Sequence, residues 1–259
     1  MRGIGVDIGS TATKVAVMET GELAQTLLMP TGFSSVDAAG RVRDALAEKG
    51  VDVAAEDVRV VATGYGRIAV PYATKVVTEI TCHGLGAAHL FGTDGTVIDV
   101  GGQDTKVIQL ANGRVTKFAM NDKCAAGTGR FLEVMADRLG IDQVELASLA
   151  RAGEDVKISS MCTVFAESEV ISLVGRGEPR ENIAHGIIES VVSRVASLAG
   201  QGSHAPLLPH GGDSARTTTW WSVWERFWAA RSRPAPRPAT PGQSAPRSRP
   251  ASCRFFSAA

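Results

Sequence analysis

Two short stretches of the sequence, DIGSTATKV at residues 7–15 and DVGGQDTKV at residues 99–107, align at a constant offset of 92 residues. Five of their nine positions are identical, namely Asp, Gly, Thr, Lys and Val. Apolar runs flank both copies, so each predicts a strand, a tight turn and a second strand. A duplicated hairpin of this kind predicts a protein built from two similar halves.

The composition of the two turns suits contact with phosphate groups. Glycine lets the backbone approach a ligand closely, hydroxyl and N–H groups donate to phosphate oxygens, and an aspartate at a strand end can hold hydrated Mg²⁺. A single copy would be interpreted equally well as an ordinary turn, whereas two matched copies favour a clamp for a polyphosphate. The P-loop pattern GxxxxGK[ST] and the dinucleotide pattern GxGxxG do not occur in the sequence.

The composition of the chain changes near residue 200. Residues 201–259 carry eight Arg, no Lys and two acidic residues, a net charge of +6, which leaves −6 on residues 1–200. All four Trp fall within residues 220–228, and eight of the eleven Pro lie at or beyond Pro206. We therefore expect a disordered, low-complexity tail over residues 201–259. Translation of GC-rich DNA in a shifted frame would produce such a tail; a tail that binds an acidic partner and a diverged subdomain are the alternatives.

Nothing in the sequence indicates export or membrane insertion. No apolar run approaches the roughly 20 residues of a membrane span, and the first residues lack a signal-peptide pattern. The expected location is cytoplasmic, and neither a membrane nor nucleic acid is an expected partner. The irregular spacing of the four cysteines also argues against a disulfide framework. These cysteines are Cys82, Cys124, Cys162 and Cys253.

Cys124 and Cys162 each precede a run with helical periodicity, FLEVMADRL and VFAESEVISLV. The start of a helix favours a thiolate and suits a metal or an anionic cluster. Two thiolates fall short of the four that an iron–sulfur cluster usually takes, but a twofold dimer would supply four. The alternative is that both are buried structural cysteines. We interpret Cys82 as a buried cysteine near the cleft and His83 as a structural hydrogen-bonding residue, and assign no role to Cys253.

Six motifs in order resemble the ATP-dependent activators of (R)-2-hydroxyacyl-CoA dehydratases, relatives of the benzoyl-CoA reductase ATPase subunits within the actin, Hsp70 and sugar kinase superfamily. The resemblance covers residues 3 to about 199. It implies an α/β fold of two duplicated actin/Hsp70-like (ribonuclease H-like) ATPase halves, residues 1–90 and 91–200, facing a nucleotide cleft. The second half would be incomplete, because Gly211, Gly212 and Asp213 only faintly echo the family's GGVAxN-like turn. The six motifs are GVDIGSTATK, ATGYGR, EITCHGLGA, IDVGGQDTK, NDKCAAGTGRF and CTVFAESEVISL.

The same resemblance implies an ATP-hydrolysing iron–sulfur electron donor that activates a 2-hydroxyacyl-CoA dehydratase by ATP-driven one-electron transfer. It implies a homodimer in which Cys124 and Cys162 of both subunits ligate one shared 4Fe-4S cluster. Ferredoxin or flavodoxin would be the electron donor, and the dehydratase, or a related acyl-CoA reductase, the acceptor. With ATP and Mg²⁺ bound, Asp7 would act through the metal and Asp104 through the attacking water. The other expected nucleotide-binding residues are Ser10, Thr11, Ala12, Thr13, Lys14, Asp99, Gly101, Gly102, Gln103, Gly127, Thr128 and Gly129.

Other functions in the same superfamily remain open from the sequence. A sugar kinase-like or acetate kinase-like phosphotransferase would use the hairpins but would not need the paired cysteines. A benzoyl-CoA reductase ATPase subunit would serve a different electron acceptor, and a nucleotide-dependent regulatory module would have no redox role. We also expect the chain to be a poor ATPase and marginally folded, because the tail replaces part of the adenosine pocket and leaves apolar surface exposed.

Overall fold

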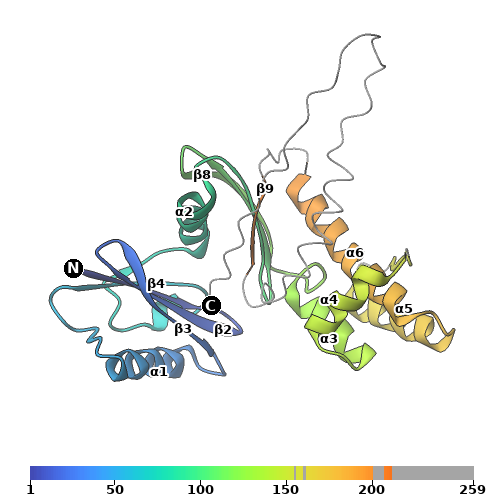
Figure 1. The fold of residues 1–259 in the computed structure, drawn as a ribbon, viewed down its shortest axis with the longest axis horizontal. Coiled ribbons are helices and arrows are strands. Elements are labelled where there is room, and N and C mark those ends of the chain that lie inside the picture. Colours follow the sequence, from blue (N-terminus) through green and yellow to red (C-terminus); the bar gives the residue numbers. More distant parts are fainter. Residues whose placement is uncertain (155, 160–161, 201–206, 212–259) are drawn as a thin grey trace, which may run out of the picture.

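The computed structural model describes residues 1–154, 156–159, 162–200 and 207–211. These residues form two sheets, each with helices packed against it, that follow one another along the chain (Figure 1). The first sheet has the strand order β3-β2-β1-β4-β5 and the second the order β8-β7-β6-β9. The elements of the first half are β1 (Arg2–Ile8), β2 (Ala12–Glu19), β3 (Glu22–Pro30), α1 (Ser35–Glu48), β4 (Val58–Thr63), the 3₁₀ turn η1 (Arg67–Ala69) and β5 (Lys75–Val76).

The core of the first half lies between its sheet and α1. Ile4, Val6 and Ile8 alternate along β1 with more exposed residues, as expected of a strand with one buried face. The buried residues of α1 recur at helical spacing and pack against the apolar face of the sheet. Ser34 caps this helix, because its Oγ accepts a 3.1 Å hydrogen bond from the amide of Asp37. The buried α1 residues are Ala38, Ala39, Val42 and Leu46.

Tyr72 ties the end of the first half to α1. Its hydroxyl donates a 2.7 Å hydrogen bond to the carbonyl of Ala39, and burial raises the pKa of Tyr72 to about 12. Because the folded state disfavours the phenolate, this contribution to stability is complete below pH 10 and is lost as the pH rises from 10 towards 12. We expect Tyr72→Phe to lower the free energy of unfolding by about 1 kcal/mol at pH 7 and to weaken its decline above pH 10.

Denaturant titration at pH 7 and at pH 11 measures both effects. Tyr65→Phe is the matched control, because Tyr65 is 83% exposed. Equal unfolding free energies for wild type and Tyr72→Phe at neutral pH would show that this hydrogen bond does not stabilise the fold.

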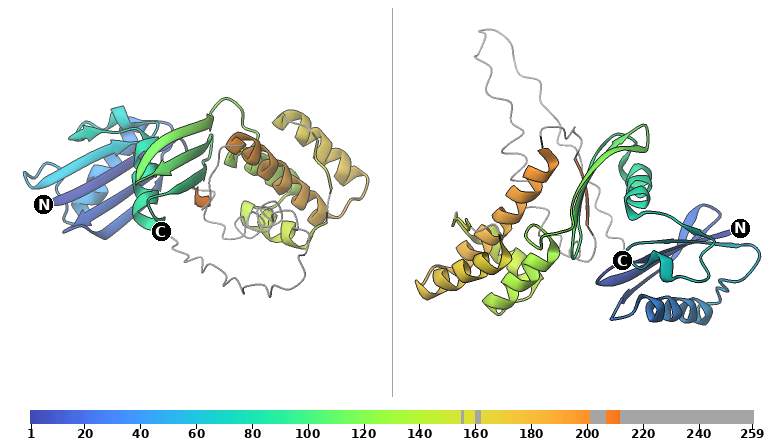
Figure 2. Two further views of the ribbon diagram at one scale, coloured as in Figure 1. Left: turned by 90° about the horizontal axis from the view of Figure 1, so that it is seen from above. Right: turned by 180° about the vertical axis from the view of Figure 1, so that it is seen from behind.

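The second sheet is covered on both faces. The helix α2 packs on one face and α3 to α6 pack on the other, as both views in Figure 2 show. The longest helix, α6, is buried along one side and forms the centre of the helical layer. The elements of this half are α2 (Glu79–Phe91), β6 (Gly95–Val100), β7 (Thr105–Ala111), β8 (Arg114–Asn121), α3 (Gly129–Leu139), α4 (Gln143–Ala152), α5 (Thr163–Gly175), α6 (Arg180–Ala199) and β9 (Leu207–Gly211).

The helix α2 belongs to the second half by packing. A Cβ added to Gly84 would lie 2.4 Å from Val115 Cγ2 on β8, so the helix backbone rests directly on that sheet. Ala87 shares a buried cluster with Val97 and Ile108. The helix α2 therefore packs on the second sheet, whereas the boundary expected from the sequence, at residue 90, places it in the first half.

The tail expected from residue 201 onward contributes one strand to the second sheet. Residues 207–211 form β9, which pairs parallel to β6 with His210 opposite Asp99 and Gly211 opposite Val100. The prediction of a disordered tail therefore does not hold for these five residues. Gly212, Asp213, the tryptophan cluster and Cys253 lie outside the described residues.

The two halves repeat the same strand pairing around their hairpins. Asp7 pairs with Lys14 across β1 and β2, and Asp99 pairs with Lys106 across β6 and β7, at the offset seen in the sequence. In both halves a further strand lies parallel to the first, β4 beside β1 and β9 beside β6. The expected duplicated α/β architecture is thus confirmed. Among the described residues no counterpart of β5 extends the second sheet, and no helix is long and apolar enough to span a bilayer.

Candidate nucleotide and cysteine site

The tips of the two hairpins meet. A Cβ added to Gly102 would lie 2.8 Å from Thr11 Oγ1, so the two tips are in close contact and a side chain at Gly102 would displace the Thr11 hydroxyl. Each tip is closed in the same way, by a hydrogen bond from the amide of Gly9 to the carbonyl of Ala12 (3.1 Å) and from that of Gly101 to that of Asp104 (2.8 Å). Side chains at the tips remain exposed to a ligand, those of Ser10, Thr11 and Gln103.

Asp7 lies at the end of β1, beside the ATGYGR motif. Its Oδ2 is 3.5 Å from Lys14 Nζ. Gly64 has φ 84°, and a Cβ there would lie 2.2 Å from Asp7 Oδ1, so the loop after β4 needs glycine to pass this carboxylate. Burial raises the pKa of Asp7, although the charge of Lys14 opposes the shift. The positive charge near the Asp7 carboxylate is therefore too small to offset the effect of its burial.

Lys106 occupies the matching place in the second hairpin and contacts three carboxylates. Its Nζ lies 2.6 Å from Asp104 Oδ1, 2.7 Å from Glu79 Oε1 and 3.5 Å from Asp99 Oδ2. The side chain is 3% exposed, and although burial alone would lower the pKa of Lys106, Asp99 and the two hydrogen-bonded carboxylates raise it. The ammonium is therefore permanently charged and fixes the position of Asp104.

His83 and Glu79 bring a third element to the site, the first turns of α2. His83 Nδ1 lies 3.0 Å from Asp99 Oδ2. Burial alone would lower the pKa of His83. The adjacent Asp99 carboxylate outweighs this effect and raises the pKa of His83. His83 thus lies at ion-pair distance from Asp99, and the structural role expected from the sequence stays a prediction. The sequence reasoning missed Glu79 and His83 as site residues, although their spacing of four on a helix places them on one face.

The carboxylate cluster, defined as Asp7, Glu79, Asp99 and Asp104, carries more negative charge than its neighbours neutralise. Two lysines and His83, whose pKa is raised, face these four carboxylates. Burial also raises the pKa of Asp104, against its hydrogen bond to Lys106. Carboxylate oxygens with excess negative charge are the kind of group that hydrated Mg²⁺ prefers. A magnesium ion held here through water stays a prediction, because the described residues do not arrange three or more such side chains to bind a metal directly.

The two cysteines lie in the helical layer of the second half. Cys162 is exposed and is the N-cap residue of α5, as the sequence predicted. Cys124 is half-buried in the loop before α3, five residues ahead of its first residue, and Arg194 Nη2 lies 3.7 Å from its Sγ. The helices α3 and α5 that follow the two cysteines pack against each other. Within the described part of the chain, no group of three or more His, Cys, Asp or Glu is arranged to hold a metal ion.

Comparison with known proteins identifies the family. The model of the BadF/BadG/BcrA/BcrD ATPase family matches residues 4–221. The chain belongs to this ATPase family. It is an ATP-binding ATPase. The (R)-2-hydroxyglutaryl-CoA dehydratase activating ATPase of Acidaminococcus fermentans is 45% identical to it over 200 residues, which cover 76% of each chain. The expected resemblance to dehydratase activators is therefore confirmed.

Two solved structures of this family are similar over most of the chain. Component A of the Acidaminococcus fermentans (R)-2-hydroxyglutaryl-CoA dehydratase superposes with a TM-score of 0.81 at 39% identity, covering 88% of this chain and 89% of the other. The activator of the 2-hydroxyisocaproyl-CoA dehydratase from Clostridium difficile, solved with bound ADPNP, gives a TM-score of 0.78 at 40% identity, covering 87% and 85%. The actin-like and sugar kinase-like fold expected from the hairpins is therefore confirmed.

Four of the expected nucleotide-binding residues of this ATPase lie behind the hairpins. The hydroxyl of Thr13 is fully buried, 2.9 Å from that of Thr31. Thr128 Oγ1 donates to the carbonyl of Ala125. The amide of Gly129 donates to Gly101, and the carbonyl of Gly127 accepts from the Thr105 hydroxyl. Gly127 and Gly129 therefore bond to the second hairpin behind its tip, and Thr13 is buried within the first.

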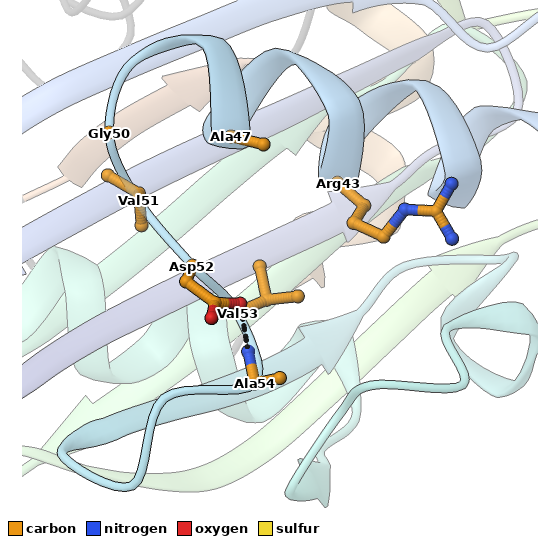
Figure 3. A pocket seen from close by; sticks show the side chains of 7 residues that line it. All are labelled: Arg43, Ala47, Gly50, Val51, Asp52, Val53 and Ala54. Carbon is orange, nitrogen blue, oxygen red and sulfur yellow. Dashed lines mark hydrogen bonds between the residues drawn. The ribbon is translucent and has the colours of Figure 1, made fainter.

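A pocket at the C-terminal end of α1 lies in the first half and contains none of the expected site residues (Figure 3). Its two charged side chains are engaged locally: Arg43 pairs with Asp44 at 2.8 Å, and Asp52 Oδ1 accepts a 2.9 Å hydrogen bond from the Ala54 amide. We therefore assign it no role in the reaction. Its lining residues are Arg43, Ala47, Gly50, Val51, Asp52, Val53 and Ala54.

Proposed function

We propose that this ATPase is the activator of a 2-hydroxyacyl-CoA dehydratase, to which it delivers one electron at the expense of ATP. The observation that carries the proposal is the placement of Cys124 and Cys162 before two contacting helices, in a chain whose hairpins face each other over a carboxylate cluster. The chain is similar to dehydratase activators over most of its length, and this similarity supports the same function. A phosphotransferase would need no paired thiols.

The hairpins supply the groups for ATP hydrolysis. Ser10, Thr11 and Lys14 would contact the β and γ phosphates from one side, and the second hairpin would face them through its tip. Asp7 and Asp99 would hold Mg²⁺ through water. Asp104 would orient the attacking water, and because its pKa is raised by burial, it is a better proton acceptor than an ordinary aspartate. Lys106 holds Asp104 in place for this step. The tip residues of the second hairpin are Gly101, Gly102 and Gln103.

The two thiols fit half of an iron–sulfur site. A 4Fe-4S cluster usually takes four cysteine ligands, and each chain offers two, one ahead of α3 and one at the start of the neighbouring α5. A twofold axis beside α5 would bring four thiols to one cluster shared by two subunits. That cluster would supply the one-electron chemistry. The expected donor is ferredoxin or flavodoxin, and moving an electron against 100 mV costs about 2.3 kcal/mol, a cost that ATP hydrolysis would offset.

The exposed face of α5 supports a second copy of this chain at that position. Val164 is 65% exposed and Phe165 68%, directly after Cys162, and Ile171, two turns further on, is 54% exposed. Val164 and Ile171 lie on the same side of the helix. In Figure 1, α5 lies at the outer edge of the helical layer. A helix face with this much apolar surface indicates an interface.

We expect Phe165→Asp to weaken the dimer and, with it, iron binding, although both cysteines of each chain remain. A charge buried at the interface would be unpaired and would cost several kcal/mol. Light scattering of the anaerobic protein, combined with iron and sulfide analysis, measures both properties. Phe33→Asp is the matched control, because Phe33 is fully exposed on the first half. A dimeric Phe165→Asp protein with wild-type iron content would place the interface elsewhere.

A further inference from the structure

The duplicated threonine of the two hairpins has different partners in the two halves. In the first half, the Thr13 hydroxyl meets that of Thr31, which donates a 2.9 Å hydrogen bond to the Gly9 carbonyl. In the second half, the Thr105 hydroxyl donates a 2.6 Å hydrogen bond to the Gly127 carbonyl, in the loop that carries Cys124. Both threonines are buried. Only the second hairpin therefore reaches a cysteine loop through this position.

Two backbone hydrogen bonds join the same hairpin and the same loop. The amide of Gly129 donates to the carbonyl of Gly101 at 2.9 Å, and that of Arg130 donates to the carbonyl of Gly102 at 2.8 Å. Gly101 and Gly102 belong to the turn that faces the first hairpin across the nucleotide site. A shift of this turn towards or away from a phosphate therefore acts directly on the first residues of α3.

The stretch between Gly127 and Cys124 has little freedom to absorb such a shift. The side-chain amide of Asn121 donates to the carbonyls of Cys124 (2.9 Å) and Ala126 (3.0 Å). On its other side, Arg194 packs over the loop: a Cβ at Gly127 would lie 3.1 Å from Arg194 Cγ. The loop is thus held between α6 and the second hairpin.

We propose that the Thr105 hydroxyl is a positioning contact through which the second hairpin sets the position of Cys124 according to the bound nucleotide. The inference rests on the proposed function and names the link between its two sites. It assigns the coupling to the second half alone, because the equivalent Thr13 is engaged within its own half. A buried hydrogen bond that joins two loops with discrete arrangements is a physical basis for coupling between sites.

The test measures the alkylation rate of Cys124 in the metal-free, full-length chain, by N-ethylmaleimide labelling and peptide mass spectrometry. In the wild type we expect saturating ADPNP and saturating ADP to give rates that differ by about fivefold or more. In Thr105→Val, which keeps the shape but loses the hydroxyl, the ratio of the two rates should fall towards one. Thr105→Ser should restore it. The alkylation rate of Cys162 is recorded in the same samples as an internal reference.

Thr116→Val is the matched control, because it makes the same substitution on β8 of the same half, where the exposed Thr116 hydroxyl donates a 3.2 Å hydrogen bond to the carbonyl of Gln109. At nucleotide concentrations shown by calorimetry to be saturating, it should keep the wild-type ratio. Iron content after anaerobic reconstitution is measured separately for every variant and should stay at the wild-type level in Thr105→Val. A wild-type rate ratio in Thr105→Val would overturn the inference and leave the proposed function standing. Equal rates with ADP and ADPNP in the wild type would overturn both.

Hydrogen exchange of the wild type keeps the inference testable if Thr105→Val does not fold. The amides of Gly129 and Arg130 should exchange at rates that differ between the ADP-bound and ADPNP-bound protein. The amide of Thr31, which donates to the Thr11 carbonyl within the first half, serves as the reference. Identical exchange of Gly129 and Arg130 in the two states would also overturn the inference.

Discussion

Asp7→Asn and Asp104→Asn are each expected to lower the rate of ATP hydrolysis by about 10²- to 10³-fold. The first substitution removes a charge that would hold Mg²⁺, and the second removes the group that would orient the attacking water. Lys106 keeps its contacts with Glu79 and Asp99 when Asp104 is replaced, so the second hairpin should retain its structure. Steady-state phosphate release at saturating ATP measures the effect.

The same two variants should not lose stability at neutral pH. Burial raises the pKa of both carboxyls above 3.8 in the folded protein, so folding favours their protonated forms. The resulting penalty is absent below pH 3.8 and grows as the pH rises through the folded pKa values. Asparagine removes this penalty, and melting temperatures at or above that of the wild type are expected. Asp44→Ala, at an exposed position on α1, is the control. Wild-type ATP turnover in both asparagine variants would show that the hairpins are not the phosphate clamp.

Cys124→Ser and Cys162→Ser should each abolish iron binding in the anaerobically purified protein. Replacing one cysteine in each chain removes two of four ligands from a shared cluster, so loss of both iron and colour is expected rather than a partial decrease. The wild type should contain about four iron atoms per two chains. ATP hydrolysis should persist in both variants, because neither thiol contacts the hairpin tips.

Cys82→Ser provides the control for this pair. Cys82 lies on α2, half-buried beside His83 and away from α3 and α5. It should keep its iron and its colour. Full iron content in either Cys124→Ser or Cys162→Ser would sink the cluster assignment, and a wild type without iron would favour a phosphotransferase or a regulatory module of the same fold.

The duplication in the sequence predicted the local geometry of the site well. The pairing of Asp7 with Lys14 and of Asp99 with Lys106 follows from strand and turn chemistry within each repeat, and the structure reproduces it at the same offset. Hydrophobic periodicity also placed Cys162 at the start of a helix. These features depend on neighbours within about ten residues, which a single sequence specifies.

Contacts between distant segments were not predictable in the same way. Thr13 and Thr105 are identical in the repeat, yet one bonds Thr31 and the other Gly127, because loops outside the repeat provide the partners. Glu79 reaches Lys106 because α2 packs on the second sheet, although the sequence assigned this helix to the first half. The composition around β9 predicted a disordered tail. The strand was not predictable from it, because the place of β9 is set by pairing with the distant β6.

Reoxidation of the reduced protein measures ATP-driven transfer of one electron to a dehydratase. The anaerobic, iron-loaded protein is reduced with dithionite, freed of excess reductant and mixed with the (R)-2-hydroxyglutaryl-CoA dehydratase of Acidaminococcus fermentans. The reduced cluster is followed by electron paramagnetic resonance. We expect the signal to be lost with ATP and Mg²⁺ and to persist with ADPNP. Equal loss of the signal without nucleotide, or its persistence with ATP, would show that the protein does not deliver an electron at the expense of ATP.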